Sequence, residues 1–176
     1  MKLIPLSQSK KCKNKELNLC AKVDDKHFEE LNKYIWRVQK AIGTDMYYAC
    51  RRNEKGELVP LHRFIMGCKK GDGKIVDHID RNGLNCLEEN LRFCTVSQNA
   101  MNKSSKRNST SKYLGVHFAK MIQGKKIYTY WRADIKAKGR SRFIGFFKTE
   151  ENAAIAYNIF AEKYHGEFAN FNTSNI

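Results

Sequence analysis

Residues 74–102 read KIVDHIDRNGLNCLEENLRFCTVSQNAMN, and this stretch decides the fold of the first part of the chain. Two short apolar runs, 74–79 and 91–95, predict β-strands, and residues 80–90 between them predict a polar loop. Residues 96–102 then predict a helix. The stretch therefore predicts a strand, a loop, a strand and a helix in succession.

Upstream of this stretch, residues 46–61 predict a β-hairpin. Two strand-like runs flank the turn 53–56, in which Gly56 provides the positive φ that the turn requires. Residues 61–67 predict a short helix that is closed by Gly67. These elements belong to the same predicted domain, residues 1–101.

Downstream, residues 102–112 (NKSSKRNSTSK) contain no apolar residue. Such a segment has no side chain with which to pack a core, so it predicts a basic linker. The linker divides the chain into a first domain, 1–101, and a second domain, 113–176.

The second domain predicts a three-stranded antiparallel sheet packed on one helix. We expect the strands at residues 113–119, 127–136 and 141–147, and a following helix with Thr149 as its N-cap. Alternation along the middle strand places Thr129, Trp131, Ala133 and Ile135 on one face and Tyr128, Tyr130, Arg132, Asp134 and Lys136 on the other. The helix covers one face, the other is basic and open, and the whole chain is expected to be of the α+β class.

The positive charge is concentrated in one part of the chain. The 176 residues include 33 Lys+Arg and 18 Asp+Glu, a net charge of +15. Between residues 98 and 146, twelve basic residues stand against one acid, Asp134. This distribution favours a polyanionic partner. No apolar stretch approaches the length of a membrane span, about 18 residues, and the first residues lack a signal peptide's apolar segment. We therefore expect a cytoplasmic, intracellular protein.

The six cysteines form no C-x-x-C pair, and they are scattered along the first 94 residues. Free intracellular thiols are expected, although zinc is left open.

Four polar residues have the spacing of a known signature. Asp77 and His78 stand at the end of one predicted strand, Asn90 follows His78 by 12 residues, and Asn99 follows Asn90 by 9. This set resembles the His-Asn-His (HNH) endonuclease signature, in the variant whose last residue is Asn. The strings LHRFIMG and VDDKHFEELNKYIW extend the resemblance to phage and intron-borne homing endonucleases. Over about residues 61–102, the resemblance implies a ββα-metal nuclease fold.

The resemblance also implies a role for each residue. His78 is the expected general base, because an imidazole with a pKa of about 6.5 is largely neutral at pH 7. Asp77 and Asn99 are expected to hold one Mg²⁺ or Mn²⁺ ion, since carboxylate and amide oxygens suit a hard cation. Asn90 is expected to orient the His78 loop by hydrogen bonding to its backbone. Expected DNA contacts in this domain are His62, Arg63 and Arg92.

Two points stay open at this stage. Adjacent residues of a strand point to opposite faces, so the resemblance requires the strand to end or bend at Asp77 and His78. Asp80 is an alternative metal ligand in place of Asp77.

The second domain has a resemblance of its own. The strings YLGV, WRADI, IGFF and TEENAA, with Asn170 near the end, are similar to the AP-two DNA-binding domain of the plant ethylene-response-factor type. In that family the open face of the sheet lies in the major groove. The expected base and phosphate contacts are His117, Arg132, Lys136, Lys138, Arg140 and Phe143.

Together these features predict a metal-dependent DNA endonuclease. It is expected to hydrolyse phosphodiester bonds of double-stranded DNA, by nicking or by paired cuts, as a monomer or a homodimer on DNA. A catalytically inactive DNA-binding regulator is the alternative, followed by an RNA-associated basic protein. Binding of RNA in preference to DNA is the feature that distinguishes the second alternative.

Overall fold

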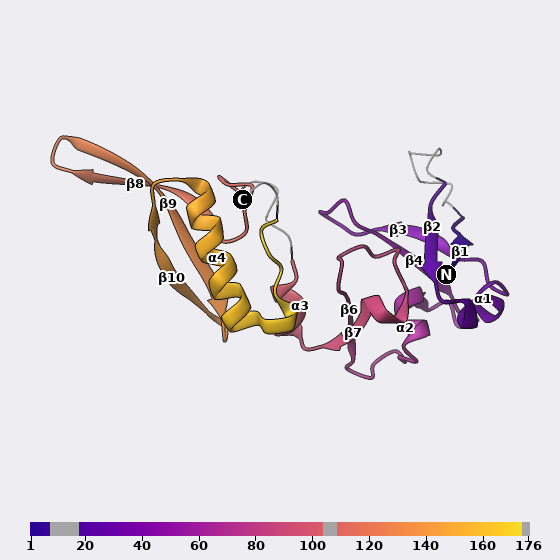
Figure 1. Ribbon diagram of the computed structural model, residues 1–176. Coiled ribbons are helices and arrows are strands. Elements are labelled where there is room, and N and C mark those ends of the chain that lie inside the picture. The colour runs from indigo at the N-terminus through magenta and orange to yellow at the C-terminus, as the bar shows by residue number, and fades with distance from the viewer. Residues whose placement is uncertain (8–17, 104–108, 174–176) are drawn as a thin grey trace. The chain divides into compact units, whose positions relative to one another are not determined.

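The computed structural model describes residues 1–7, 18–103 and 109–173 (Figure 1). The chain forms two compact units, Met1–Thr95 and Val96–Ile176. All of its sheets are antiparallel and small, and short helices accompany them, which is consistent with the α+β class.

The described residues of the first unit form three small sheets. The first is the pair β1 (Lys2–Pro5) and β2 (Cys20–Val23), which is followed by α1 (Asp25–Leu31). The second has the order β3 (Arg37–Lys40), β4 (Tyr47–Arg52) and β5 (Leu58–Pro60), after which comes α2 (Leu61–Ile65). The third is β6 (Ile75–His78) with β7 (Leu91–Cys94), and the short helix η1 (Glu88–Asn90) precedes β7.

One core joins β1, β2, α1, β4, α2 and the loop between β6 and β7 in the first unit. Its buried members include Ile4, Val23, Leu31, Trp36, Ala49, Leu61 and Cys86. Trp36 is 1% exposed, and its indole Nε1 donates to the Leu31 carbonyl oxygen at 2.9 Å. Because Leu61 begins α2 and Cys86 lies in the loop between β6 and β7, the core fixes both next to β4.

The predicted hairpin and short helix are confirmed. β4 pairs with β5, and Gly56 in the turn has φ +76°. Asn53 Oδ1 accepts a hydrogen bond from the Glu57 backbone N–H at 2.8 Å, which closes the turn. Gly67, with φ +65°, follows α2 as expected.

The predicted strand, loop, strand and helix are also confirmed, as β6, residues 79–90, β7 and α3 (Val96–Met101). α3 groups with the second unit, so the units divide at Thr95 and Val96, ahead of the predicted linker. Residues 104–108 of that linker lie outside the described residues. The predicted domain boundaries stay predictions.

Ser111, near the end of the predicted linker, belongs to the folded second unit. It is 5% exposed, and its hydroxyl donates to Glu150 Oε1 at 2.5 Å and accepts from the Tyr113 backbone N–H at 3.0 Å. Ser111 is therefore buried although its neighbours in sequence are polar, because its hydroxyl both donates and accepts a hydrogen bond.

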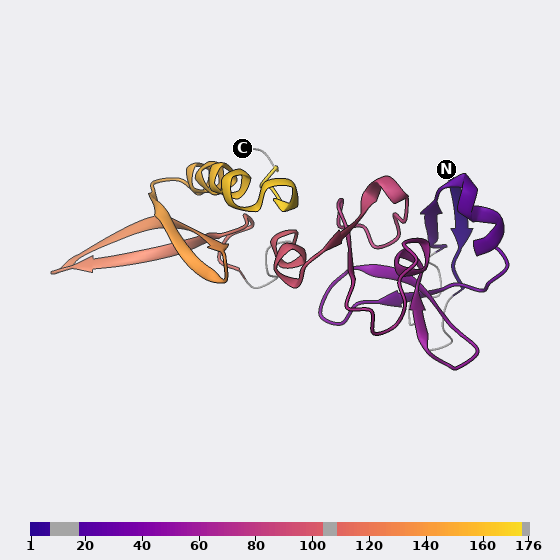
Figure 2. The same ribbon diagram turned by 90° about the horizontal axis from the view of Figure 1, so that it is seen from below.

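The second unit is a sheet of order β10-β9-β8 with α4 (Glu150–His165) on one side (Figure 2). The strands are β8 (Val116–Gln123), β9 (Lys126–Ala137) and β10 (Arg140–Phe147), and η2 (Gly166–Phe168) follows α4. Side chains buried between helix and sheet are Val116, Ala133, Ile135, Ala153, Ala154, Tyr157 and Ala161. Thr149 caps α4 as predicted: its side chain accepts from the Asn152 backbone N–H at 3.2 Å.

The prediction of the first strand at 113–119 was wrong at both ends. Gly115 has φ +67°, which is incompatible with a continuous strand. The backbone of Leu114 instead bonds to the Asn172 side chain, whose Oδ1 accepts from the Leu114 N–H at 2.7 Å and whose Nδ2 donates to its carbonyl at 3.2 Å. β8 therefore begins at Val116 and continues to Gln123, alongside β9.

Cys20, Cys50, Cys68, Cys86 and Cys94 form no disulfide with one another, and Cys12 lies outside the described residues. Within the described ranges, no helix has the length and apolar character needed to cross a membrane.

Candidate active site

His78 is the last residue of β6, and it is 4% exposed. Its ring lies edge-on to the His62 ring, with centroids 4.7 Å apart, and 5.8 Å from the Tyr48 ring. Burial lowers the pKa of His78, and the negative charges of Asp80 and Asp77 oppose this effect in part. The imidazole is therefore neutral at pH 7.

Asn90 fastens the loop that follows His78. Its Oδ1 accepts from the Asp80 backbone N–H at 3.0 Å, and its Nδ2 donates to Asp80 Oδ1 and to the Asn85 carbonyl oxygen, both at 2.8 Å. The Ile79 backbone N–H donates to the Asn90 carbonyl oxygen at 2.9 Å. Two of these bonds, to the Asp80 N–H and to the Asn85 carbonyl oxygen, are side-chain-to-backbone contacts of the kind expected of Asn90. Its part in catalysis stays a prediction.

The Asp80 side chain also stabilises this loop by hydrogen bonding within it. Burial raises the pKa of Asp80, but hydrogen bonds from Asn85, from the Asn82 backbone N–H and from Asn90 together outweigh it, so the pKa is lowered. Asp80 Oδ1 accepts from Asn82 at 2.8 Å, and Oδ2 accepts from Asn85 Nδ2 at 2.7 Å. Its carboxylate is thus ionised and engaged within the loop.

Asp77 pairs with Arg92 across the β6–β7 ladder. Asp77 Oδ2 accepts from Arg92 Nη2 at 2.9 Å and from Nε at 3.1 Å, and the two side chains are 8% and 13% exposed. The sequence predicts that Asp77 binds the metal and that Arg92 contacts DNA, whereas in the structure the two side chains form an ion pair. β6 includes both Asp77 and His78 and ends at His78, which is one of the two arrangements that the resemblance requires.

His62 lies on α2, where its ring packs against those of His78 and Tyr48. Burial lowers the pKa of His62 to about 3, and the charges of His78 and Arg63 act in the same direction. His62 is therefore neutral and borders the His78 ring. Its contact with DNA stays a prediction.

Arg63, the next residue of α2, binds the segment that leads into β6. Its guanidinium donates to the Lys69 carbonyl oxygen at 2.8 Å, to the Lys74 carbonyl oxygen, and to Asp72 Oδ1 at 2.8 Å. The segment from Lys69 to Lys74 is thus tied to α2. A phosphate contact of Arg63 stays a prediction beside this structural role.

Two residues that were not among the predicted site residues, Cys86 and Tyr48, border His78. Cys86 is fully buried, and its Sγ lies 3.9 Å from His78 Nε2. Burial raises the pKa of Cys86 to about 12, so the thiol is neutral. Tyr48 lies on β4. A Cβ atom added at Gly83 would lie 2.6 Å from the Tyr48 ring, so the loop between β6 and β7 packs closely against β4. No local sequence pattern connects a hairpin strand with a loop more than 30 residues away.

Asn99 lies on α3, in the second unit. Its pairing with Asp77 in one metal site stays a prediction.

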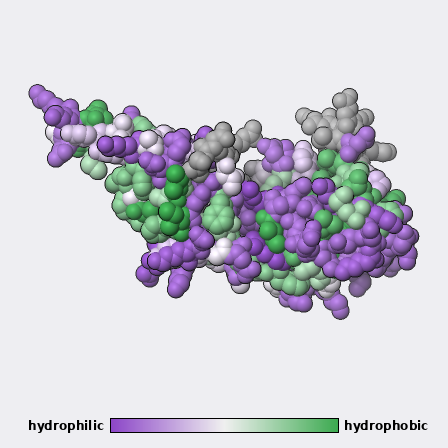
Figure 3. Space-filling view, in the orientation of Figure 1, coloured by the Kyte–Doolittle hydropathy of each residue, from purple (hydrophilic) through white to green (hydrophobic). Residues whose placement is uncertain are grey.

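The expected DNA contacts of the second unit lie on the open face of its sheet and at the β9–β10 turn. Arg132 stands opposite His117, and its guanidinium binds Asp134 through two hydrogen bonds, 2.6 and 2.7 Å, while lying 5.2 Å from the Phe143 ring centroid. Lys136, Lys138 and Arg140 are exposed, and Lys138 has φ +50° in the turn. In the view of Figure 3, hydrophilic residues cover much of the visible surface of each unit, with apolar residues interspersed among them. Specific DNA contacts stay predictions.

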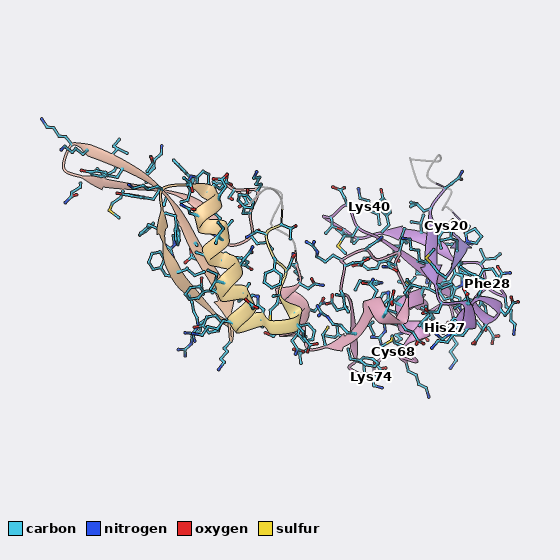
Figure 4. All side chains as sticks on the ribbon, in the orientation of Figure 1. Cys20, His27, Phe28, Lys40, Cys68 and Lys74 are labelled. Atoms are coloured by element: carbon cyan, nitrogen blue, oxygen red, sulfur yellow. The ribbon has the colours of Figure 1, made fainter. Side chains whose placement is uncertain are left out.

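A second group of possible metal ligands lies at α1, where Figure 4 labels His27. Donor atoms of Asp24, His27 and Glu88 all lie within 4.8 Å of one another. Glu88 Oε2 is 2.5 Å from Lys26 Nζ, its Oε1 is 2.6 Å from His27 Nε2, and Asp24 Oδ2 accepts from the Glu88 backbone N–H. The polar groups of these residues therefore already have hydrogen-bond partners. Sequence reasoning missed this group because Glu88 is distant from α1 in the chain.

Comparisons with known proteins place this site in a family. The sequence profile of the HNH endonuclease family matches residues 59–101, which contain His62, Asp77, His78, Asn90 and Asn99. An uncharacterized HNH endonuclease of Acanthamoeba polyphaga mimivirus is 35% identical over 144 residues, 79% of this chain and 67% of the relative. Protein 3.8 of Escherichia phage T7 is 30% identical over 99 residues, 56% of this chain and 76% of the relative. No solved structure matches the chain significantly.

HNH nucleases generally use divalent metals, and a nuclease acts on nucleic acid. The identity to the mimivirus protein extends over two thirds of that relative, and the profile match includes the whole strand, loop, strand and helix. The chain belongs to the HNH endonuclease family.

Proposed function

We propose that the protein is a metal-dependent endonuclease of the homing type, which hydrolyses phosphodiester bonds in double-stranded DNA. The observation that carries this proposal is the setting of His78. A neutral imidazole ends β6, and its loop is fixed by the Asn90 side chain. A base for activating water needs this combination of a neutral nitrogen and a fixed position.

In this mechanism His78 accepts a proton from water at a ring nitrogen, and the resulting hydroxide attacks the phosphorus. The bond from phosphorus to the 3′ oxygen breaks, and the departing 3′ oxygen takes up a proton from solvent, which leaves a 5′ phosphate and a 3′ hydroxyl. Asp80 and Asp77 lie near enough to raise the pKa of His78 against the effect of burial, so their charges stabilise the imidazolium once the proton has moved. Asn90 holds the loop position through the Asp80 backbone N–H, and it acts as a positioning residue.

The proposed metal ligands are Asp77 and Asn99, with Mg²⁺ or Mn²⁺ as the ion. Their carboxylate and amide oxygens fit a hard cation that keeps several positions for water and phosphate. When bound, the ion supplies positive charge at the scissile phosphate and the leaving 3′ oxygen. Because Asp77 Oδ2 is held by Arg92, the carboxylate must share or exchange that contact to bind a cation.

The second unit supplies DNA affinity in this proposal, as an AP-two-like domain. Its support is the uncovered sheet face with His117, Arg132 and Phe143, together with Lys136, Lys138 and Arg140. Phosphate contacts by such cations give affinity, and contacts with base edges give the sequence preference.

A binding-only DNA regulator is the second candidate, and two observations are compatible with it. Asp77 already has an ion-pair partner in Arg92, and the side chain of His78 is 4% exposed. Both features suit a stable, inactive core as well as a nuclease centre. The two candidates differ in a single property, namely metal-dependent cleavage.

The test is incubation of the full chain with supercoiled plasmid that contains the DNA flanking its own gene, with Mg²⁺ or with EDTA. The His78→Ala variant is the control, and its DNA binding is measured separately. Open circles that need both Mg²⁺ and His78 establish a nicking nuclease, and linear product indicates paired cuts by two chains. Binding without cleavage by the wild type establishes the regulator. Stronger binding to RNA of the same sequence contradicts both.

A further inference from the structure

The β8–β9 hairpin extends beyond the part of the sheet that packs on α4 (Figure 1). The strands stay paired from Val116 opposite Ala133 to Gln123 opposite Lys126, and Gly124, with φ +60°, forms the turn. Residues 119–130 contain no buried side chain. An isolated two-stranded ribbon is marginally stable in water, so the length of this hairpin is not explained by the core of its unit.

The end of the hairpin carries apolar side chains that the fold does not use. Ile122 and Ile127 stand opposite each other in the ladder and are 73% and 65% exposed. Met121, at 46%, and Tyr128, at 37%, form the adjacent pair. Single exposed apolar residues are ordinary, but consecutive residues of a strand point to opposite faces, so the end of this projection presents an exposed apolar cross-strand pair on each face.

The same segment is positively charged. Lys120, Lys125 and Lys126 lie around the apolar pairs, and there is no acidic residue from 117 to 133. A partner must therefore accept apolar side chains and offer negative charge around them. Duplex DNA does both, because its stacked bases lie between two rows of phosphates. It also agrees with the nucleic-acid substrate of the family.

We propose that the end of the β8–β9 hairpin is a DNA wedge. Lys120, Lys125 and Lys126 bind phosphates, and the Ile122–Ile127 pair inserts at a deformable base step, which it unstacks and bends. Apolar side chains are used in this way by proteins that kink DNA, most easily at flexible pyrimidine–purine steps. The inference rests on the proposed double-stranded substrate, and it assigns the hairpin a task separate from cleavage and from the open sheet face.

The test compares the full-length wild type with I122T/I127T. Threonine keeps the β-branched shape that favours a strand, so the hairpin is preserved while its apolar surface is removed. The matched control is I155T/I159T, which changes two exposed isoleucines on the outer side of α4, 44% and 61% exposed. The probe is an end-labelled duplex of about 40 base pairs, short compared with the persistence length of about 150 base pairs, with a central TA step.

Energy transfer between the duplex ends measures the bend, and titration measures the affinity. We expect the wild type and the control to bend the duplex, whereas I122T/I127T loses most of the bend and about tenfold in affinity. A duplex with a mismatch at the central step, which unstacks more easily, should restore much of the affinity of I122T/I127T. The K120Q/K125Q/K126Q variant should reduce the slope of the salt dependence of binding by about 0.9 for each phosphate that the lysines no longer neutralise.

Three results overturn the wedge. The first is an equal bend with wild type and I122T/I127T while the wild type still cleaves plasmid, which leaves the proposed function intact. The second is a change in sedimentation of the free protein on I122T/I127T substitution, which assigns the apolar pairs to contact between two copies. The third is wild-type binding to anionic lipid vesicles but not to duplex DNA, which overturns the proposed substrate as well.

Discussion

The two units place their candidate functional residues in opposite environments. In the first unit Asp77, His78 and Asn90 are buried, and each has neighbours that fix its position. In the second unit Arg132, Lys136 and Phe143 lie on an exposed face. A fixed, buried group suits a reaction that depends on distance, whereas exposed cations suit affinity for a polyanion. Substitutions in the first unit should therefore alter rate, and those in the second should alter affinity.

The largest expected effect separates the stabilities of the two units. A Cβ at Gly115, where φ is +67°, would lie 2.3 Å from the Tyr157 ring and 2.4 Å from the Asp134 carbonyl oxygen. Gly115→Ala should destabilise the second unit by about 4 kcal/mol, through backbone strain and overpacking together. Gly139→Ala is the control, because its φ is +75° but nothing lies near its Cβ, and about 1 kcal/mol is expected.

Each unit has one tryptophan, Trp36 and Trp131, so fluorescence reports on each separately. Urea unfolding of single-tryptophan versions measures the two effects. If Gly115→Ala shifted the Trp36 transition as much as the Trp131 transition, the units would not be independent.

The next effect tests whether the first unit works through position. Asn90→Ala removes the acceptor of the Asp80 backbone N–H and should reduce cleavage about 100-fold while DNA affinity stays close to that of the wild type. Asn53→Ala removes a similar side-chain-to-backbone bond from the β4–β5 turn and serves as the control. Equal losses of cleavage in both variants would mean that general stability, and not the His78 loop, limits activity. Initial rates of plasmid nicking provide the comparison.

The pH dependence of stability tests the burial of His62 in the first unit. The folded-state pKa of His62 is about 3 against 6.5 when exposed, so the unfolded chain binds more protons between these values. Stability of the first unit is therefore full above pH 6.5 and is lost as the pH falls toward 3, with about 2 kcal/mol lost at about pH 5. The lowered pKa of His78 acts in the same direction.

Urea unfolding followed by Trp36 fluorescence at pH 7 and about pH 5 measures this loss. The His62→Gln substitution should remove most of the pH-dependent loss of stability that His62 causes. An unchanged pH dependence in that variant would show that His62 is accessible to solvent and protonates freely in the folded protein.

The smallest expected effect concerns the stability that the N-cap of α4 contributes to the second unit. Thr149→Ala removes the acceptor for the Asn152 backbone N–H and should cost the second unit about 1 kcal/mol, without changing cleavage. Ser141→Ala, on the exposed surface of β10, is the control. Thermal unfolding monitored at Trp131 is the measurement, and a shift equal to that of the control would contradict the capping role.

Local patterns were sufficient for most of the secondary structure. Gly56 and Gly67 marked the hairpin turn and the end of α2, and Thr149 marked the start of α4, because turns and caps depend on residues close together in sequence. The first strand of the second unit was misplaced because Asn172, nearly 60 residues later, binds the backbone of Leu114. No local signal announces such a partner.

The sequence by itself determined the order of the elements, the charge contrast between the two parts of the chain, and the spacing of Asp77, His78 and Asn90 within the stretch that matches the family profile. The tertiary structure decided which groups meet. In the structure, Arg92 pairs with Asp77. His62 and Tyr48 pack against His78, and Cys86 is buried next to it. These contacts join strands and loops that are distant in the chain. They depend on the packing of a common core, which periodicity and local propensity do not encode.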